Sequence, residues 1–93
     1  MKKPTATPAN AGRKKVTFAW PAVQIPAAVA GDFSNWEHLP LKPQGDGMAR
    51  TMYLPPGEYH YRFVVNGEWC ADPACPETAP NDFGSFNNVL HVA

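Results

Sequence analysis

The sequence predicts an all-β domain, a sandwich of about six to eight short strands. No window keeps apolar residues at helical spacing without a proline interrupting it. Eleven prolines and seven glycines divide the 93 residues into short segments. Short alternating segments with turn residues between them are typical of a β-sandwich. We therefore expect one small domain built from strands alone.

Six segments carry the pattern of a strand. They span residues 16–20, 24–31, 48–54, 59–65, 68–70 and 86–92. In the clearest of them, Tyr61 and Phe63 point to one face and Arg62 to the other. The Asn66-Gly67 pair that follows favours a type I′ turn, because both central residues of that turn need positive φ. We expect a hairpin there, and a long loop over residues 71–85, which contain three prolines.

Charge is distributed unevenly along the chain. Residues 1–15 hold five of the eight basic residues and no acid, and too few apolar side chains to offset the entropy of ordering. We expect a disordered basic tail over 1–15 and a folded domain over 16–93. That domain has three basic and eight acidic residues, a net charge of −5. Phosphate backbones would repel it, so we expect no nucleic-acid partner.

The N-terminal region imitates a secretion signal, because a basic start is followed by an apolar stretch and then Ala28-Val29-Ala30. That stretch is broken by Pro21, Gln24 and Pro26, and cleavage would remove two predicted strands. No run of about 18 apolar residues could span a membrane. We therefore expect a cytoplasmic protein with no membrane partner.

Cys70 and Cys75 are the only cysteines, and they have the spacing C-x4-C. The three histidines, His38, His60 and His91, are scattered without the spacing of metal ligands. We predict no metal site and no cofactor. Two alternatives stay open for the cysteines: a small disulfide loop, or two reduced thiols.

Eleven aromatic residues are more than a small sandwich needs in its core. The six expected in the core are Phe18, Trp20, Phe33, Tyr59, Tyr61 and Phe63. Trp36 and Trp69 lie in polar segments instead, where a flat indole could stack on the apolar face of a sugar ring. Arg62, Asn87 and Asn88 could donate to sugar hydroxyls. The alternative is that both tryptophans are hydrophobic plugs over the ends of the sandwich.

Several segments, taken in order, resemble a known family. They are Val16-Thr17-Phe18-Ala19-Trp20, Val29-Ala30-Gly31-Asp32-Phe33-Ser34-Asn35-Trp36, Leu39-Pro40-Leu41, residues 56–69, Asp72-Pro73 and residues 83–92. Together they resemble the glycogen-binding domain of the AMP-activated protein kinase β subunit. They also resemble the early-set domain at the N-terminus of isoamylases and branching enzymes, carbohydrate-binding module family 48. The resemblance covers residues 16–92.

This resemblance implies an immunoglobulin-like, early-set sandwich and a set of carbohydrate-binding residues. The implied set is Trp36, Arg62, Trp69, Phe83, Ser85 and Asn87. Trp36 and Trp69 would be stacking platforms. Arg62 stands where the family carries a lysine, Phe83 where it carries a leucine, and Ser85 where it carries a threonine.

The partner implied is an α-glucan such as glycogen, starch or a maltooligosaccharide, bound without catalysis. We expect no enzyme, because a small sandwich offers no deep cleft to set two carboxylates opposite each other. No nucleophile stands beside a histidine in a recognisable pattern. The alternative function is a protein-interaction module that docks a glycogen-metabolising enzyme or associates with itself.

Overall fold

The computed structural model describes residues 12–23 and 26–93, which form nine strands and one short 3-10 helix. The strands are β1 Lys14–Trp20, β2 Ala27–Gly31, β3 Leu39–Pro40, β4 Lys42–Gln44, β5 Gly47–Leu54, β6 Gly57–Val65, β7 Glu68–Cys70, β8 Thr78–Pro80 and β9 Phe86–Val92. The helix η1 is Asp32–Ser34.

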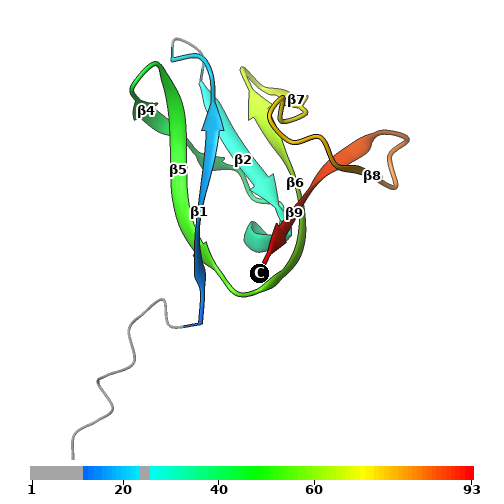
Figure 1. The fold of residues 1–93 in the computed structure, drawn as a ribbon. Coiled ribbons are helices and arrows are strands. Elements are labelled where there is room, and N and C mark those ends of the chain that lie inside the picture. The colour runs from blue at the N-terminus through cyan, green and yellow to red at the C-terminus, as the bar shows by residue number, and fades with distance from the viewer. Residues whose placement is uncertain (1–11, 24–25) are drawn as a thin grey trace, which may run out of the picture.

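The strands form two antiparallel sheets (Figure 1). The smaller sheet has the order β1-β5-β4. The larger has the order β3-β2-β6-β9-β8, and β7 pairs with β6 beside this path. Aromatic contacts between β1 and β6 join the sheets, with ring centroids of Phe18 and Tyr61 5.0 Å apart. The predicted all-β sandwich is confirmed.

Three of the strands are absent from the sequence-based expectation. These are β3, β4 and β8, each two or three residues long and each containing a proline. A segment this short shows no alternation, so only its pairing with a neighbouring strand reveals it. The predicted loop over residues 71–85 therefore contains a strand, which pairs with β9 from Thr78 to Pro80.

The first strand begins at Lys14, two residues before the predicted start of the folded domain. Lys14 pairs with Leu54 and Lys15 with Tyr53. Lysine is tolerated there because β1 lies at the edge of its sheet and both side chains are exposed. The rest of the predicted tail, up to residue 11, lies outside the described residues, as do positions 24–25 of the second predicted strand.

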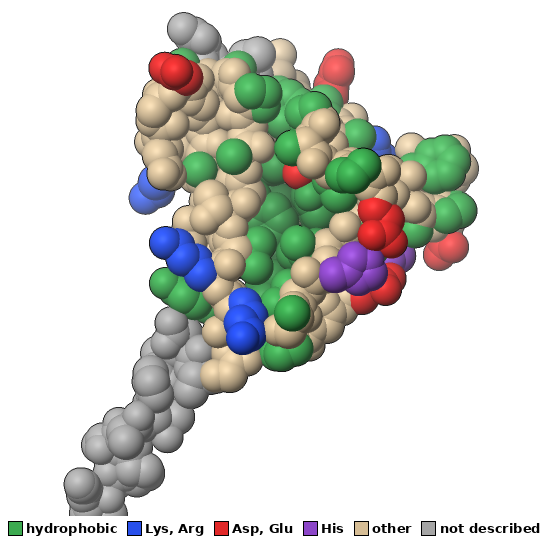
Figure 2. All heavy atoms as spheres, in the orientation of Figure 1, with side chains coloured by type: hydrophobic (Ala, Val, Ile, Leu, Met, Phe, Trp, Pro, Cys, Tyr) green, Lys and Arg blue, Asp and Glu red, His purple; other side chains and the backbone are tan. Residues whose placement is uncertain are grey.

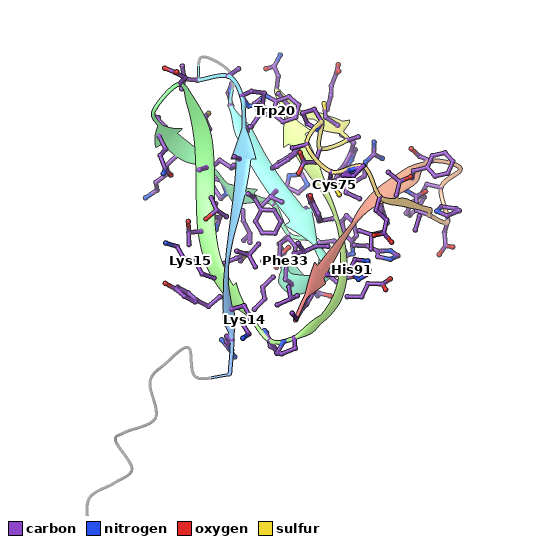
Figure 3. The ribbon with its side chains drawn as sticks, in the orientation of Figure 1. Lys14, Lys15, Trp20, Phe33, Cys75 and His91 are labelled. Atoms are coloured by element: carbon purple, nitrogen blue, oxygen red, sulfur yellow. The ribbon has the colours of Figure 1, made fainter. Side chains whose placement is uncertain are left out.

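The predicted core aromatics all pack in or against the interior. Phe18, Tyr61 and Phe63 are buried. Trp20 and Phe33 are partly buried and pack against that cluster, while the Tyr59 ring lies beside Phe33. Figure 3 shows Phe33 between the two sheets.

Part of the apolar interior is visible from outside. Figure 2 shows hydrophobic side chains in the opening between β1 and β9. Within the described chain, β1 pairs only with β5, so its other edge carries no strand. Val16, Met52 and Leu90 pack on the core yet stay partly exposed.

The two cysteines are free thiols in the structure. The Cys75 Sγ donates weakly to the carbonyl oxygens of Glu77 and Val89, each at 3.4 Å. Cys70 is in β7 opposite Phe63 and packs against the core. Of the two alternatives left open, the structure has the unpaired thiols.

Candidate functional site

The outer face of the larger sheet carries the candidate site. In β6 the residues Tyr61 and Phe63 point into the core, so His60, Arg62 and Val64 point outward. Trp69 in β7 is paired with Val64 and therefore shares that outer face. The hairpin thus places Trp69 beside Arg62 on the surface away from the smaller sheet.

A groove of about 720 Å³ runs over this face. Five of the six predicted site residues line it: Trp36, Arg62, Trp69, Phe83 and Asn87. The sixth, Ser85, is hydrogen-bonded to Arg62 across the side of the groove. Residues from three separate stretches of the chain are therefore brought together.

Trp36 is held by an irregular turn after η1. Asn35 and Trp36 both have positive φ, at 55° and 65°, a conformation that costs free energy for residues other than glycine. The Trp36 amide donates to the Gly31 carbonyl at 2.9 Å. The indole Nε1 donates to Asp32 Oδ1 at 3.1 Å. Hydrogen bonds thus hold Trp36 at its backbone amide and at the nitrogen of its indole ring.

Gly31 is needed where this turn meets β6. A Cβ at that position would lie 2.6 Å from the His60 carbonyl oxygen and 2.7 Å from the Tyr61 Cβ. Real Cβ atoms do not approach so closely, so only glycine lets the turn lie this near β6. Gly31 therefore lets the turn that carries Trp36 lie close to β6.

Trp69 is the second of the two predicted platforms, and 46% of its surface is exposed. Its ring centroid lies 6.2 Å from that of Trp36, and the ring planes are inclined by 57°. On another side, the His38 ring meets Trp69 edge-on at 5.3 Å and 87°. The two indoles form an angled pair instead of one flat surface.

Arg62 lies partly buried between the platforms and the β8–β9 hairpin. Its Nη1 donates to Ser85 Oγ at 3.4 Å. Its Nε is buried and has no hydrogen-bond partner among the described residues. A buried donor without an acceptor is costly. Because Nε is enclosed, only the terminal nitrogens of the guanidinium could donate to a molecule in the groove.

The loop between β8 and β9 presents Phe83, which is 91% exposed. Asn81 holds this loop: its Oδ1 accepts from the amides of Phe83 at 2.9 Å and Ser85 at 3.1 Å. Its Nδ2 donates to Asn87 Oδ1 at 3.1 Å. Gly84 has φ of 77°, which glycine adopts without strain. The exposed ring is therefore carried by an ordered turn.

Five further residues line the groove that were not among the six predicted site residues. They are Asp32, His60, Pro80, Asn81 and Asp82. Alternation along β6 does place His60 on the outer face, although no role was assigned to it. The signal for Asn81 was weaker, since an asparagine that follows a proline and stands three residues before Gly84 indicates a turn but not which groups it will bind.

Histidines and acids gather beside the site. His60 Nε2 lies 3.3 Å from Glu58 Oε2, and His91 Nε2 lies 2.8 Å from Glu77 Oε1. Figure 2 shows histidine and acidic side chains together next to β9. In the described part of the chain, no three histidine, cysteine or acidic side chains are placed to hold a metal ion. None of its helices is long and apolar enough to cross a membrane.

The fold is a small β-sandwich with an angled pair of indoles in an open groove, an arrangement typical of carbohydrate-binding modules. Residues 14–93 match the family model described as the glycogen recognition site of AMP-activated protein kinase. The chain belongs to that family, and the resemblance stated from its sequence is confirmed.

Curated relatives agree with this assignment. The chain is 32% identical to the 5'-AMP-activated protein kinase subunit beta-1 of Sus scrofa over 84 residues, 90% of this chain and 68% of the relative. It is 33% identical to the beta-1 subunit of Bos taurus over the same length, which is 31% of that protein. It is 35% identical to the beta-2 subunit of Mus musculus over 65 residues, 69% of this chain and 24% of that protein. The chain thus spans less than a third of the latter two relatives.

Proposed function

We propose that the chain binds α-1,4-glucan chains of the glycogen type, without catalysis, in the groove on the outer face of the larger sheet. The observation that carries the proposal is the geometry of Trp36 and Trp69, two indoles 6.2 Å apart and inclined by 57°. The folded unit that binds is residues 14–93, the same residues that match the glycogen-recognition family.

The angle between the indoles favours a curved chain. A pyranose ring has an apolar face of C–H groups that stacks on a flat aromatic ring, and stacking on an aromatic side chain is worth about 1–3 kcal/mol where measured for bases. Two planes inclined by 57° cannot both lie flat against one straight, ribbon-like chain. Successive glucose units of an α-1,4 chain turn relative to one another, so each can meet its own platform.

The polar side chains beside the two indoles would form hydrogen bonds with the hydroxyl groups of the sugar. Arg62 lines the groove, and the terminal nitrogens of its guanidinium are planar donors. Asn87 lines the groove from β9, and Ser85 Oγ contacts Arg62. Phe83 projects from the rim, where its ring packs against the apolar side of a curved chain. These four residues complete the proposed site.

The groove favours binding over hydrolysis. Asp32 and Asp82 line it, but both Asp32 oxygens already accept hydrogen bonds, from Trp36 Nε1 and from the His60 amide. Glycoside hydrolysis needs one carboxyl group free to give a proton and a second free to act on the sugar. The proposal is therefore a module that holds glucan.

An NMR titration with maltoheptaose tests the proposal, because the three indole N–H signals report separately. We expect the signals of Trp36 and Trp69 to shift, while that of Trp20, which packs on Phe63 at 5.4 Å, stays still. Cellohexaose, a straight β-1,4 chain, should cause much smaller shifts. If no indole signal moves at millimolar maltoheptaose, the proposal is wrong.

Single substitutions test whether the two indoles contribute to binding. Trp36→Ala and Trp69→Ala should each weaken maltoheptaose binding by roughly fivefold or more, the loss of one stacking contact of about 1 kcal/mol or more. Tyr53→Ala is the matched control, because Tyr53 is another exposed aromatic residue but belongs to the smaller sheet. If calorimetry gave equal affinities for all three variants, the indoles would not contribute to sugar binding.

Protein docking is a second candidate, which the relatives favour because they are named as subunits of a kinase. The described chain also leaves one edge of β1 without a partner strand, next to partly exposed apolar residues. A protein that ignores maltoheptaose but elutes as a dimer, or with a stoichiometric partner, would place docking ahead of sugar binding.

A further inference from the structure

The carboxylate of Asp32 joins the two halves of the proposed site. Its Oδ1 accepts from the Trp36 indole Nε1 at 3.1 Å, and its Oδ2 accepts from the His60 backbone amide at 2.8 Å. His60 is in β6, two residues before Arg62. One side chain therefore ties the first stacking platform to the strand that carries the main hydroxyl donor.

The bond to Asp32 complements the backbone hydrogen bond from Trp36 to Gly31, because a backbone bond does not fix the rotation of the indole. Trp36 follows a three-residue helix and lies in the left-handed region with φ of 65°. Outside regular secondary structure, a partly exposed indole can rotate about its side-chain bonds, and ordering it on binding would reduce the affinity. A charge-assisted hydrogen bond is stronger than a neutral one and fixes the ring before the ligand arrives.

The same bond decides which part of Trp36 a ligand can use. An indole has a single N–H donor, and in the structure Asp32 accepts it. Trp36 therefore has its ring face to offer but no free donor, so hydroxyl recognition is left to Arg62 and Asn87.

We propose that Asp32 is the positioning residue of the glucan site: it sets the Trp36 ring at its angle to Trp69 and at a fixed distance from Arg62. The inference rests on the proposed function, and it adds a residue that acts through Trp36 instead of on the sugar. Asp32 would make the platform preorganised, so that binding does not have to order it.

Asp32→Asn is the direct test, since it keeps the size of the side chain but replaces one acceptor oxygen with an amide nitrogen that cannot accept. We expect the Kd for maltoheptaose to rise roughly two- to tenfold, the cost of ordering one side chain on binding. The Trp36 indole N–H signal should shift upfield and exchange faster with solvent. The Trp69 and Trp20 signals should not change.

Asp82→Asn is the matched control. Asp82 lines the same groove and carries the same charge, but no hydrogen bond joins it to an indole in the described structure. This variant should leave the Trp36 indole signal in place. A loss of affinity in Asp82→Asn as large as in Asp32→Asn would show that charge in the groove matters and that orientation of the ring does not.

A double-mutant cycle with Trp36→Phe separates positioning from a general structural role. Phenylalanine keeps an aromatic face but has no N–H for Asp32 to hold. In the Trp36→Phe background, Asp32→Asn should change the Kd less than twofold, because interacting residues are not additive. If Asp32→Asn lowered the affinity equally in both backgrounds, the proposal would be overturned. Urea unfolding would confirm that each variant is folded.

The outcomes distinguish this inference from the function on which it rests. A wild-type protein that fails to bind maltoheptaose overturns the proposed function itself. A wild-type protein that binds, with Asp32→Asn binding equally well, overturns only the role of Asp32.

Discussion

Tyr61 brings a hydroxyl into the core from β6. Only 4% of the residue is exposed, and its Oη donates to Asp72 Oδ2 at 2.6 Å. Asp72 is in turn fixed by its backbone amide, which donates to the buried Asn88 Oδ1 at 2.8 Å. Burial raises the pKa of Tyr61 far above its usual value, and the hydrogen bond to Asp72 and the charge of Asp72 raise it further.

This pKa shift predicts a loss of stability in alkali. In the unfolded chain Tyr61 loses its proton near pH 10, whereas in the folded protein it keeps it, so the folded state binds more protons above that pH. The contribution of Tyr61 is therefore complete below about pH 10 and declines as the pH rises further, by up to about 1.4 kcal/mol per pH unit. In urea unfolding, the advantage of wild type over Tyr61→Phe should be present at pH 8 and shrink above pH 10.

Tyr53→Phe is the control for alkaline unfolding, because Tyr53 is exposed on β5. Its stability should follow that of the wild type across the whole range. If Tyr61→Phe lost stability as steeply as the wild type above pH 10, another group would be responsible for the alkaline transition.

Single residues also show how far sequence could predict the site. Alternation along β6 placed Arg62 on the outer face, and the structure agrees, because the side-chain period of a strand is fixed. Asp32 escaped prediction because one of its contacts is with Trp36 in a turn of positive φ, and the other is with the backbone of His60, 28 residues away. Local periodicity reveals neither contact. Trp36, Trp69, Arg62 and Asn87 were candidates from the sequence pattern, whereas Phe83 and Ser85 came from the family resemblance alone. The role of all six in binding stays a prediction.

At the scale of elements, length decided which strands could be predicted. The strands β1, β5, β6 and β9 have seven to nine residues and were located within two residues at each end. The strands β3, β4 and β8 have two or three residues, and contacts with a neighbouring strand define them. A segment of two or three residues is too short to show alternation, so its own sequence pattern carries no trace of these contacts.

The β8–β9 hairpin depends on one side chain, which gives a prediction at this scale. Asn81 makes three hydrogen bonds that hold the turn carrying Phe83. At about 0.5–1.5 kcal/mol for each bond, reduced by partial exposure, Asn81→Ala should lower the free energy of unfolding by about 1–2 kcal/mol. Hydrogen exchange at the amides of Phe83 and Ser85 should become faster.

The same variant should weaken maltoheptaose binding, because Phe83 and Asn87 lose their fixed positions. Gln44→Ala serves as the control, since Gln44 is an exposed amide on β4 in the smaller sheet. Unchanged exchange at Phe83 and Ser85 in Asn81→Ala would mean that the turn is ordered by other contacts.

At the scale of the whole molecule, the two faces of the larger sheet have different tasks. Its inner face packs against the smaller sheet, with Trp20 against Phe63 and Phe18 against Tyr61. Its outer face carries the groove. Because the core is built on one face, residues such as Trp69 and Phe83 can stay exposed without weakening it. Because the core does not depend on them, the residues of the proposed site can be substituted while the fold is kept.

The charge of the folded domain leads to the final prediction. Residues 16–93 have a net charge of −5, yet a glucan is neutral, and stacking and hydrogen bonds to hydroxyls release no counterions. The Kd for maltoheptaose should therefore change less than about twofold between about 50 and about 500 mM NaCl, whereas binding that neutralises several phosphates weakens by orders of magnitude over a similar range. Calorimetry at four salt concentrations measures this directly, with Arg62→Lys as a companion variant that keeps the charge but changes the donor geometry. A steep fall in affinity with salt would show that an anionic ligand, and not a neutral sugar chain, is what the groove recognises, and Arg62 would then act chiefly through its charge.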